Sequence, residues 1–301
     1  MREPIGPCRF PLPVGALLDE PEPDLNYRHA FHAGNFADVV KHALLTRLIA
    51  YLKRKEKPFR VFDTHAGRGR YDLNASEASR TGEAQAGVLK IAQSTTLRAE
   101  PLLADYFAAI DPDLREGFYP GSPLIARRCL RETDRLSAYE LHPEDGGALR
   151  DLFAGDVQVK AISLDGWLAL GAHLPPKEKR GLVLIDSPFE KPSEVDDILS
   201  GLEKALSRWR GGVYAIWYPI KRRALVEKLL TAIAGMAAGE ALAVEVRIAA
   251  DESAEGLFLG TGFAVINPPF VFAEEAKAIV DLLLPALKRD GSATARVFTL
   301  T

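Results

Sequence analysis

The hydrophobic pattern of the chain consists mainly of short, continuous apolar runs separated by patterns of helical period. Continuous runs are typical of strands covered on both faces, whereas half-exposed strands alternate. Strands that alternate with helices predict a doubly wound α/β fold with a Rossmann-like, mostly parallel sheet. The predicted strands are 60–65, 135–141, 157–163, 181–187, 212–219, 242–248 and 260–269.

Helical patterns occupy the intervals between strands, and one interval is unusually long. A helix over 37–55 precedes the first strand. About 70 residues then separate the first and second strands, roughly three times what one crossover helix requires. Two stretches within this interval, "EAQAGVLKIAQ" and "EPLLADYFAAI", have helical patterns. Because long structureless loops are rare, we predict an inserted helical subdomain at 75–118 and a main domain formed by 26–74 and 119–301.

The first 25 residues differ in composition from the rest of the chain. They contain six prolines and follow neither a strand nor a helix period, so we expect 1–25 to be a disordered N-terminal extension. Glu3 and the interrupting prolines do not fit a signal peptide. We therefore expect translation of the native protein to start near Leu25.

Composition limits the class of protein. A hydrophobic content of 47% is ample for a large core, and 26% charged residues is ordinary for a globular chain. No apolar run approaches the roughly 20 residues that span a bilayer, so no membrane partner is predicted. The two cysteines, Cys8 and Cys129, cannot form a disulfide framework and indicate reduced thiols in a cytoplasmic protein.

The charge is unevenly distributed along the chain. The whole sequence carries a net charge of −3, but residues 27–70 contain ten Lys or Arg against three acids. A local basic segment of this kind suits contacts with nucleic-acid phosphates. For "KRKEK" at 53–57 alone, a solvated helix end is an equally good explanation, because cations favour a helix C-terminus.

The end of the first strand, "DTHAGRGRY", favours a nucleoside cofactor. Gly67 and Gly69 after Asp63 predict a tight turn that lets a ligand approach the backbone. A nicotinamide fingerprint would need Gly or Ala at a third position, where this chain has Asp72. The Gly-x-Gly pattern by itself is weak, since many such loops are only turns.

Acidic residues at successive strand ends strengthen the cofactor prediction. Glu140 follows the second strand and is placed to accept hydrogen bonds from ribose hydroxyls, and Asp165-Gly166 follows the third and is placed to read an adenine amino group. Asp186 follows the fourth. Any one of them could be a helix N-cap, Asp165 above all. Together they predict a site for S-adenosylmethionine, since ligands sit at the carboxyl ends of parallel strands.

Two loops match the pattern of a site that holds the amino group of a base. "LIDSPFE" at 184–190 offers Asp186, and "VINPPFV" at 265–271 offers Asn267. The second is closer in text to the Asp/Asn/Ser-Pro-Pro-aromatic signature of amino-group methyltransferases. We nevertheless assign catalysis to Asp186, because the fourth strand lies in the middle of the expected sheet and the last strand towards its edge.

Four histidines near the start of the chain also suggest a metal hypothesis. They are His29, His32, His42 and His65, and His-x-x-His spacing can bring two ligands together. No cysteine lies nearby, and the carboxylates have another use. We therefore predict no metal.

Long motifs in this order resemble the RlmJ family. They are "NYRHAFHAGNFADVVKHALL", "DTHAGRGRY", "RTGE", "YPGSPLIAR", "ELHP", "LIDSPFE", "YAIWYP" and "INPP", and the likeness runs from about residue 26 to the C-terminus. The resemblance implies a class I methyltransferase with a seven-stranded sheet and a helical insertion. It also implies S-adenosylmethionine-dependent methylation of N6 of one adenine in 23S rRNA. The expected partner is that rRNA before subunit assembly is complete, and the expected state is a monomer.

The resemblance also implies roles for individual residues. Asp186 would be the catalytic acceptor, and Tyr27 would touch the RNA. The remaining implied residues are cofactor contacts: His42, His65 and Ser122 at the methionine end, Glu140 at the ribose, and Asp165 with Gly166 at the adenine.

This chain departs from the family at the catalytic loop, where the usual Asp-Pro-Pro-Tyr is Asp-Ser-Pro-Phe. The backbone carbonyl of Ser187 can still accept one N6 hydrogen, and Phe189 can still stack on a base. The fixed φ of proline is lost, so the loop is expected to be less preorganised. Activity is expected to survive this change.

The expected mechanism needs no strong base. Asp186 and the Ser187 carbonyl would each accept one N6–H, aligning the nitrogen lone pair for in-line transfer to a base that has left its helix. Arg28, Arg68 and Arg70 would contact RNA phosphates. Two alternatives remain at this stage: a DNA adenine-N6 methyltransferase, and a non-catalytic RNA-binding protein with an altered loop.

Overall fold

The computed structural model describes residues 32–75, 82–191, 193–237, 239–250 and 258–301. The predicted extension 1–25 lies outside these ranges, as do Tyr27, Arg28 and His29. Within the described ranges, no helix is long and apolar enough to cross a membrane.

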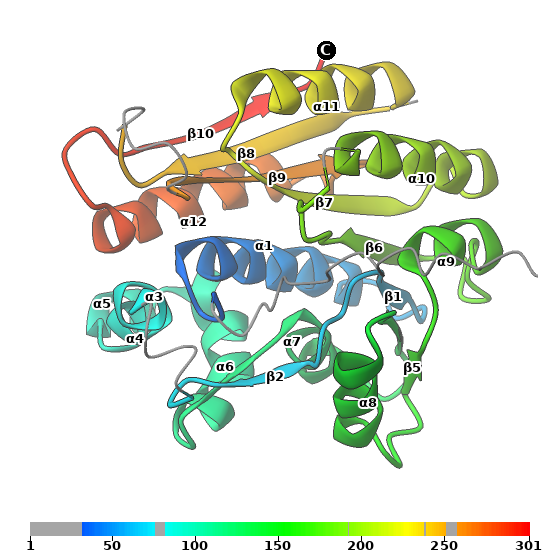
Figure 1. The fold of residues 1–301 in the computed structure, drawn as a ribbon, viewed down its shortest axis with the longest axis horizontal. Coiled ribbons are helices and arrows are strands. Elements are labelled where there is room, and N and C mark those ends of the chain that lie inside the picture. The colour runs from blue at the N-terminus through cyan, green and yellow to red at the C-terminus, as the bar shows by residue number, and fades with distance from the viewer. Residues whose placement is uncertain (1–31, 76–81, 192, 238, 251–257) are drawn as a thin grey trace, which may run out of the picture.

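One mixed sheet forms the centre of the molecule (Figure 1). Its strand order is β10-β8-β9-β7-β6-β1-β4-β5, and the four neighbouring pairs from β7 to β5 are parallel. β9 runs antiparallel to both β7 and β8, and β10 runs antiparallel to β8. The bounds are β1 Arg60–Asp63, β4 Arg135–Tyr139, β5 Val159–Ile162, β6 Gly181–Ile185, β7 Val213–Pro219, β8 Ala241–Arg247, β9 Gly260–Ile266 and β10 Thr294–Thr299.

The predicted α/β class with a mostly parallel sheet is confirmed, and the strand count is corrected. All seven predicted strands are present, but the sheet has eight. The additional strand, β10, lies at the edge and is half exposed, so its sequence "TARVFT" has no continuous apolar run. The criterion that found the buried strands could not find this one.

Helices cover both faces of the sheet, because successive strand residues point to opposite sides. On β6, Leu182 and Leu184 pack with one set of helices, and Val183 and Ile185 pack with the other. The first face carries α1 Phe36–Lys53, α7 Ser122–Cys129, α8 Pro143–Leu152 and α12 Phe272–Leu287; the second carries α9 Gly166–Ala172, α10 Glu194–Arg208 and α11 Arg223–Met236.

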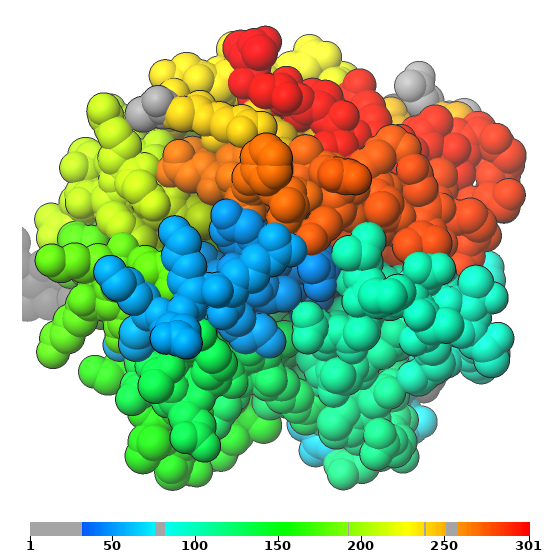
Figure 2. Space-filling model, turned by 180° about the vertical axis from the view of Figure 1, so that it is seen from behind, coloured from blue at the N-terminus to red at the C-terminus, as the bar shows by residue number. Residues whose placement is uncertain are grey.

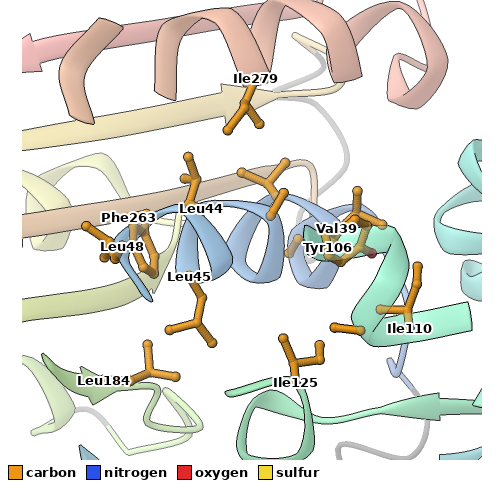
Figure 3. Close-up of a cluster of buried hydrophobic side chains, with 14 of the residues drawn as sticks. Val39, Leu44, Leu45, Leu48, Tyr106, Ile110, Ile125, Leu184, Phe263 and Ile279 are labelled. Carbon is orange, nitrogen blue, oxygen red and sulfur yellow. The ribbon is translucent and has the colours of Figure 1, made fainter. Parts of the chain in front are cut away.

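Helix α1 lies deep in the first layer. Leu44 faces Ile279 of α12, while Leu45 on the other side faces Leu184 and Ile125 (Figure 3). Most of its residues are buried. Its C-terminal end and the turn towards β1 reach the back surface, between β9–α12 and the segment from α6 to α7 (Figure 2). Because α1 is covered on nearly all sides, its charged side chains need partners within the protein.

Further helices precede α7 in the interval between β1 and β4. They are α3 Glu83–Ala86, α4 Val88–Ala92, α5 Thr95–Ala99, a 3-10 turn Pro101–Leu103 and α6 Ala104–Leu114. A small antiparallel ribbon of β2 (Arg70–Asp72) and β3 (Phe118–Pro120) joins the two ends of the interval. The interval shares its hydrophobic cluster with α1 and α12.

Candidate functional site

A cavity of about 300 Å³ opens at the carboxyl ends of β1, β4, β5 and β6. Parallel strands that end at the same edge bring distant residues together there. Every described residue assigned to catalysis or cofactor binding lines this cavity: His42, His65, Gly67, Ser122, Glu140, Asp165, Gly166, Asp186, Ser187 and Phe189. Arg68 and Arg70 do not line it.

The turn after β1 is tied to the end of β4. Gly67 adopts φ +59°, and a Cβ there would lie 2.3 Å from the Tyr71 hydroxyl oxygen, so any other residue would be strained and would have to displace Tyr71. The Gly67 amide donates to Oε2 of Glu140 at 2.8 Å, and the His142 amide donates to Oε1 at 2.8 Å. Burial raises the pKa of Glu140. Each carboxylate oxygen keeps a further lone pair for a ligand.

The turn after β5 supplies a cap and a flat wall. Oδ1 of Asp165 accepts a hydrogen bond from the Trp167 amide at 2.7 Å and caps α9. Asp165 is therefore a helix N-cap, as the alternative explanation held, and it also lines the cavity. A Cβ on Gly166 would lie 2.2 Å from the Thr64 carbonyl oxygen. Trp167 meets the His65 ring edge-on at 4.7 Å, and burial lowers the pKa of His65 to about 4. Leu141, also on the cavity, is 63% exposed.

Helix α1 brings a buried cation to the loop that contains Asp186. Nζ of Lys41 donates to Oδ2 of Asp186 at 2.6 Å and lies 2.9 Å from Oδ1 of Asp38. Burial alone would lower the pKa of Lys41, but the two carboxylates raise it above its usual value, so the ammonium stays charged. The sequence pattern did not indicate a role for Lys41 at this site. The available signal was a charged pair, Asp38 and Lys41, spaced i and i+3 among the mostly apolar residues of this helix.

The bottom of the cavity holds two further buried contacts. Oγ of Ser122 donates to Oδ2 of Asp63 at 2.6 Å. Burial raises the pKa of Asp63 to about 7, and the nearby Asp186 adds to this shift. Nδ1 of His42 lies 2.8 Å from the Tyr119 hydroxyl oxygen, which extends the site towards the inserted helices.

The loop that contains Asp186 is strained. Phe189 adopts φ +54°, which is unusual for a bulky residue and common at functional sites. Its ring meets Trp217 edge-on at 5.7 Å, and Trp217 meets Phe258 at 6.1 Å. Ser187 is buried. The loop therefore faces an aromatic wall formed by Phe189, Trp217 and Phe258, whose rings come from segments far apart in the sequence.

Asn267 follows β9, which is an interior strand between β7 and β8 and not an edge strand, and it lies at the strand ends opposite the cavity. Because β9 runs antiparallel to β7, the end of β9 pairs with the beginning of β7, at Tyr214. Nδ2 of Asn267 donates to the carbonyl oxygens of Arg210 and Gly212, at 2.8 and 2.7 Å. Asn267 closes a turn and does not line the cavity.

The basic segment is largely engaged in ion pairs. Arg68 Nε donates to Asp145 at 2.9 Å, and Arg70 pairs with the buried Asp113 and with Glu116. The "KRKEK" stretch follows the C-terminal end of α1, at the edge opposite the cavity, where backbone carbonyls of Lys55 and Lys57 accept from Arg131. This position fits the helix-end explanation for 53–57.

The described histidines have non-metal partners. His32 pairs with Glu83, His42 with Tyr119, and His65 with Thr64. Among the residues that the structure describes, no three His, Cys, Asp or Glu side chains are grouped so as to hold a metal ion. His29 lies outside those residues.

Comparisons with known proteins agree on one family. The family model described as "Ribosomal RNA large subunit methyltransferase D, RlmJ" matches residues 56–299. "Ribosomal RNA large subunit methyltransferase J" of Escherichia coli K12 is 39% identical over 91% of this chain and 98% of its own length. The protein of the same name from Haemophilus influenzae is 37% identical over 92% and 99%. A solved Legionella pneumophila protein is 33% identical and superposes with a TM-score of 0.82, covering 90% of this chain and 99% of that one.

Proposed function

The chain belongs to the RlmJ family of large-subunit ribosomal RNA methyltransferases, and from this premise we propose that it methylates N6 of one adenine in 23S rRNA, using S-adenosylmethionine. Membership confirms the resemblance seen in the sequence and makes the chain an rRNA methyltransferase. The atom that is methylated, the cofactor and the residue roles are the proposal. One observation carries it: Asp186 is fixed by a buried lysine at the edge of the cavity.

The cavity fits a nucleoside cofactor with an amino-acid end. Gly67 and Gly166 line the cavity without adding a side chain to it, and Glu140, next to Gly67, offers two carboxylate oxygens. The exposed apolar side chain of Leu141 offers a surface for a flat ring. When bound, S-adenosylmethionine supplies an electrophilic methyl group. Glu140 would hold the ribose, and Asp165 with Gly166 the adenine of the cofactor.

Lys41 is proposed to position the catalytic carboxylate. It occupies Oδ2 of Asp186 at 2.6 Å, which leaves Oδ1 to accept a hydrogen bond from N6. The Ser187 carbonyl would accept the second N6–H, so that the nitrogen lone pair points at the methyl carbon. N6 would become acidic only as it gains the methyl group and the sulfonium loses it as a neutral thioether, and Asp186 would then hold the departing proton by a hydrogen bond. Alignment and electrostatics supply the catalysis.

The aromatic wall is proposed to hold the target base after it leaves its helix. Phe189, Trp217 and Phe258 form a continuous set of rings beside Asp186. An extruded base is commonly stacked on such side chains. Nζ of Lys221 lies 5.6 Å from the Phe258 ring centre and lines the same cavity, where it can meet a phosphate.

Substrate contacts outside the cavity remain proposals. Arg68 is paired with Asp145, a residue of the cavity wall, so it is well placed to exchange that carboxylate for an RNA phosphate. Arg70 is held by two acids, one of them buried, and so would be harder to redirect. Tyr27 and Arg28 are proposed as further RNA contacts, and the chain is proposed to act as a monomer on rRNA before assembly is complete.

The deciding experiment is a mass-spectrometric nucleoside assay. The full chain and S-adenosylmethionine are incubated with protein-free large-subunit rRNA and, separately, with duplex DNA. We expect N6-methyladenosine in the RNA alone, reduced by about 10²–10³ in Asp186→Asn. Asn267→Ala is the matched control, checked by thermal melting because it loses two hydrogen bonds.

Other outcomes of this assay have distinct meanings. N6-methyladenine in the DNA would favour the alternative substrate. An intact fold that binds the cofactor but modifies neither polymer would leave an RNA-binding protein with an altered loop. Full activity in Asp186→Asn would remove this carboxylate from the mechanism.

A further inference from the structure

One rim of the cavity leads onto a row of positively charged side chains. Lys221 lines the cavity and follows the end of β7, and the exposed Arg222 comes directly after it. The Ile220 amide donates to the carbonyl oxygen of Gly260 at 2.8 Å, which places the beginning of β9 beside this rim. The surface next to the cavity therefore continues onto the strand ends of the antiparallel part of the sheet.

The row continues past β9 to the end of α12. Arg247, the last residue of β8, pairs with Gly260 in the sheet, and the Arg289 amide donates to the carbonyl oxygen of Ile248 at 2.8 Å. Neighbouring strands lie about 4.8 Å apart, so the row from the end of β7 to Arg289 extends over roughly 15 Å. We call four of its side chains the cationic edge: Lys221, Arg222, Arg247 and Arg289.

The charges of the cationic edge are not neutralised by described carboxylates. The buried acid nearest to them in the sheet, Glu245, is paired with Arg223 and Arg296. No side chain of the cationic edge forms an ion pair with a residue that the structure describes. Nε of Arg247 is buried and has no hydrogen-bond partner among those residues, although buried donors normally have one. The cationic edge can therefore bind an anion without first losing a partner.

The inserted helices have the opposite character. Residues 82–118 contain six acids against three Lys or Arg. Arg98 is paired with Asp111, while Arg70 and Arg128, which border the insertion, share the buried Asp113. A polyanion would be repelled by the acids here and would have to break existing ion pairs. Figure 1 shows these helices and the strands β8, β9 and β10 on different sides of α1.

The segments that meet at the cationic edge are basic as a group. They contain six Lys or Arg against one acid and comprise residues 219–225, 246–250, 258–260 and 287–294. The stretch 251–257 adds three acids and lies outside the described residues, and the cations still outnumber the acids when it is included. Of the two surfaces compared, only this one has the charge that phosphates require.

We propose that the cationic edge binds the RNA backbone next to the target adenine, so that the rRNA strand leaves the cavity across the ends of β9 and β8 and not across the inserted helices. An extruded nucleotide stays joined to its neighbours through its phosphates, which must lie on a surface continuous with the cavity. Basic grooves commonly track a nucleic-acid backbone in this way. The inference rests on the proposed function for the base held in the cavity, whereas the rRNA contact itself can be measured without methylation.

The first experiment measures the salt dependence of binding between the full chain and protein-free large-subunit rRNA, without cofactor. Each phosphate contact that is lost should lower the slope of log K against log salt by about 0.7–0.9. We therefore expect Arg222→Gln/Arg247→Gln/Arg289→Gln to lower the slope by about 2. At about 0.15 M salt its binding should be weaker by about tenfold to a hundredfold. None of these three residues lines the cavity.

The matched control removes two exposed cations from the inserted helices. Lys90 lies in α4 and Arg115 follows α6, and neither forms an ion pair with a described residue. Lys90→Gln/Arg115→Gln should leave the slope unchanged. Equal slopes in the triple variant and the unaltered protein, or a larger loss in the control, would overturn the proposal. Arg222→Gln/Arg289→Gln changes only exposed side chains and should still lose about 1.5 of the slope if thermal melting shows the triple variant to be less stable.

The second experiment locates the RNA on the unaltered protein. The chain is acetylated with an amine-reactive ester, with and without the rRNA, and the modified lysines are quantified by mass spectrometry. Lys288, which is exposed beside Arg289, should be protected at least threefold, and Lys90 should not be. Protection of Lys90 with Lys288 left reactive would place the RNA on the inserted helices and overturn the proposal.

The two proposals fail separately. If the nucleoside assay finds no N6-methyladenosine while the slope and the protection of Lys288 are as expected, the cationic edge stands and the proposed atom of methylation falls. If N6 is methylated and the slope of the triple variant equals that of the unaltered protein, only the cationic edge falls. An unaltered protein that does not bind the rRNA would also overturn the cationic edge.

Discussion

The loops at Asp186 and Asn267 look alike in sequence and differ in almost every physical respect. Each follows a buried strand, and each leads through proline to phenylalanine. Asp186 ends a strand that is parallel to its neighbours and reaches the cavity, where a buried lysine meets its carboxylate. Asn267 follows β9, which runs antiparallel to β7. Its side-chain amide donates to two backbone carbonyls at the strand ends opposite the cavity.

The backbone strain is also distributed differently. Both loops contain one residue at φ +54°, which is Phe189 in the first and Asn267 in the second. Asparagine adopts left-handed conformations readily, whereas for phenylalanine they are costly. The first loop therefore stores strain at the cavity, and the second uses a residue suited to its turn. The two motifs have similar sequences. The direction of the preceding strand and the surrounding residues decide which loop faces the cavity and which closes a turn.

The largest expected effect comes from removing Lys41, the buried cation that contacts the Asp186 loop. Lys41→Met leaves Asp38 and Asp186 close together without a counter-charge, so the free energy of unfolding should fall by about 3–5 kcal/mol. Urea denaturation at neutral pH measures it. Lys277→Met, which removes an exposed pair with Asp281, is the control and should cost less than about 1 kcal/mol. Equal losses in the two variants would mean that burial adds nothing to the Lys41 pair.

The second prediction concerns pH, because a titrating buried acid lies near Asp186. Burial raises the pKa of Asp63 from 3.8 to about 7. The folded protein therefore keeps a proton that the unfolded chain releases, and this contribution to stability is full below about pH 4 and is lost as pH rises through about 7. Asp63→Asn removes the dependence.

The measurement is urea denaturation of both proteins between about pH 4 and pH 8. The unfolding free energy of the variant minus that of the unaltered protein should rise by up to about 4 kcal/mol over this range. His65, whose pKa is lowered to about 4, gives the opposite slope in both proteins and so cancels in the difference. A difference that does not change with pH would contradict the raised pKa.

The third prediction tests the structural role of the second loop. Asn267→Ala loses two hydrogen bonds and the residue type that tolerates its backbone conformation, so we expect a loss of about 1–3 kcal/mol in unfolding free energy. Methylation of rRNA at saturating substrate should stay within about twofold. Asn267→Gly, which keeps the backbone conformation accessible, separates the two contributions. A large loss of activity in a folded Asn267→Ala protein would reopen the choice of loop.

The smallest expected effect concerns loop stiffness. Ser187→Pro installs the proline that the family resemblance leads us to expect here, and no described backbone acceptor takes the Ser187 amide hydrogen. Fewer accessible conformations should raise the methylation rate about twofold to fivefold, corresponding to about 0.4–1 kcal/mol. Pro268→Ser makes the reverse change in the second loop and should leave the rate unchanged. A slower Ser187→Pro enzyme would mean that the serine backbone conformation is itself required.

The sheet was predictable because buried parallel strands are continuous apolar runs, which a single sequence displays. The strand-end residues were predictable for the same reason, since topology brings Glu140, Asp165 and Asp186 to one edge. The half-exposed β10 and the short β2–β3 ribbon have no such runs. Pairing across more than 40 residues leaves no local signal.

Partners of charged residues were not predictable. In the sequence, Lys41 is one of several cations in a basic segment. Only the packing of α1 shows that its side chain contacts Asp186. Arg70 reads as a phosphate contact, and its pairing with Asp113 depends on the fold of the intervening helices. Tyr119 begins the motif "YPGSPLIAR", and nothing in the sequence indicates that its hydroxyl contacts His42. Patterns indicate which residues are charged or buried, and the fold decides which of them meet.

The deep position of α1 has a consequence for how the protein is made on the ribosome. α1 is synthesised early, but it packs against α12, which begins at Phe272 near the end of the chain. At about 5–20 residues per second, roughly 10–50 s pass between the two. During that time the apolar side of α1 that faces Ile279 has no partner. We expect nascent chains halted before α12 to bind chaperones and to be sensitive to protease, and the completed chain to be neither.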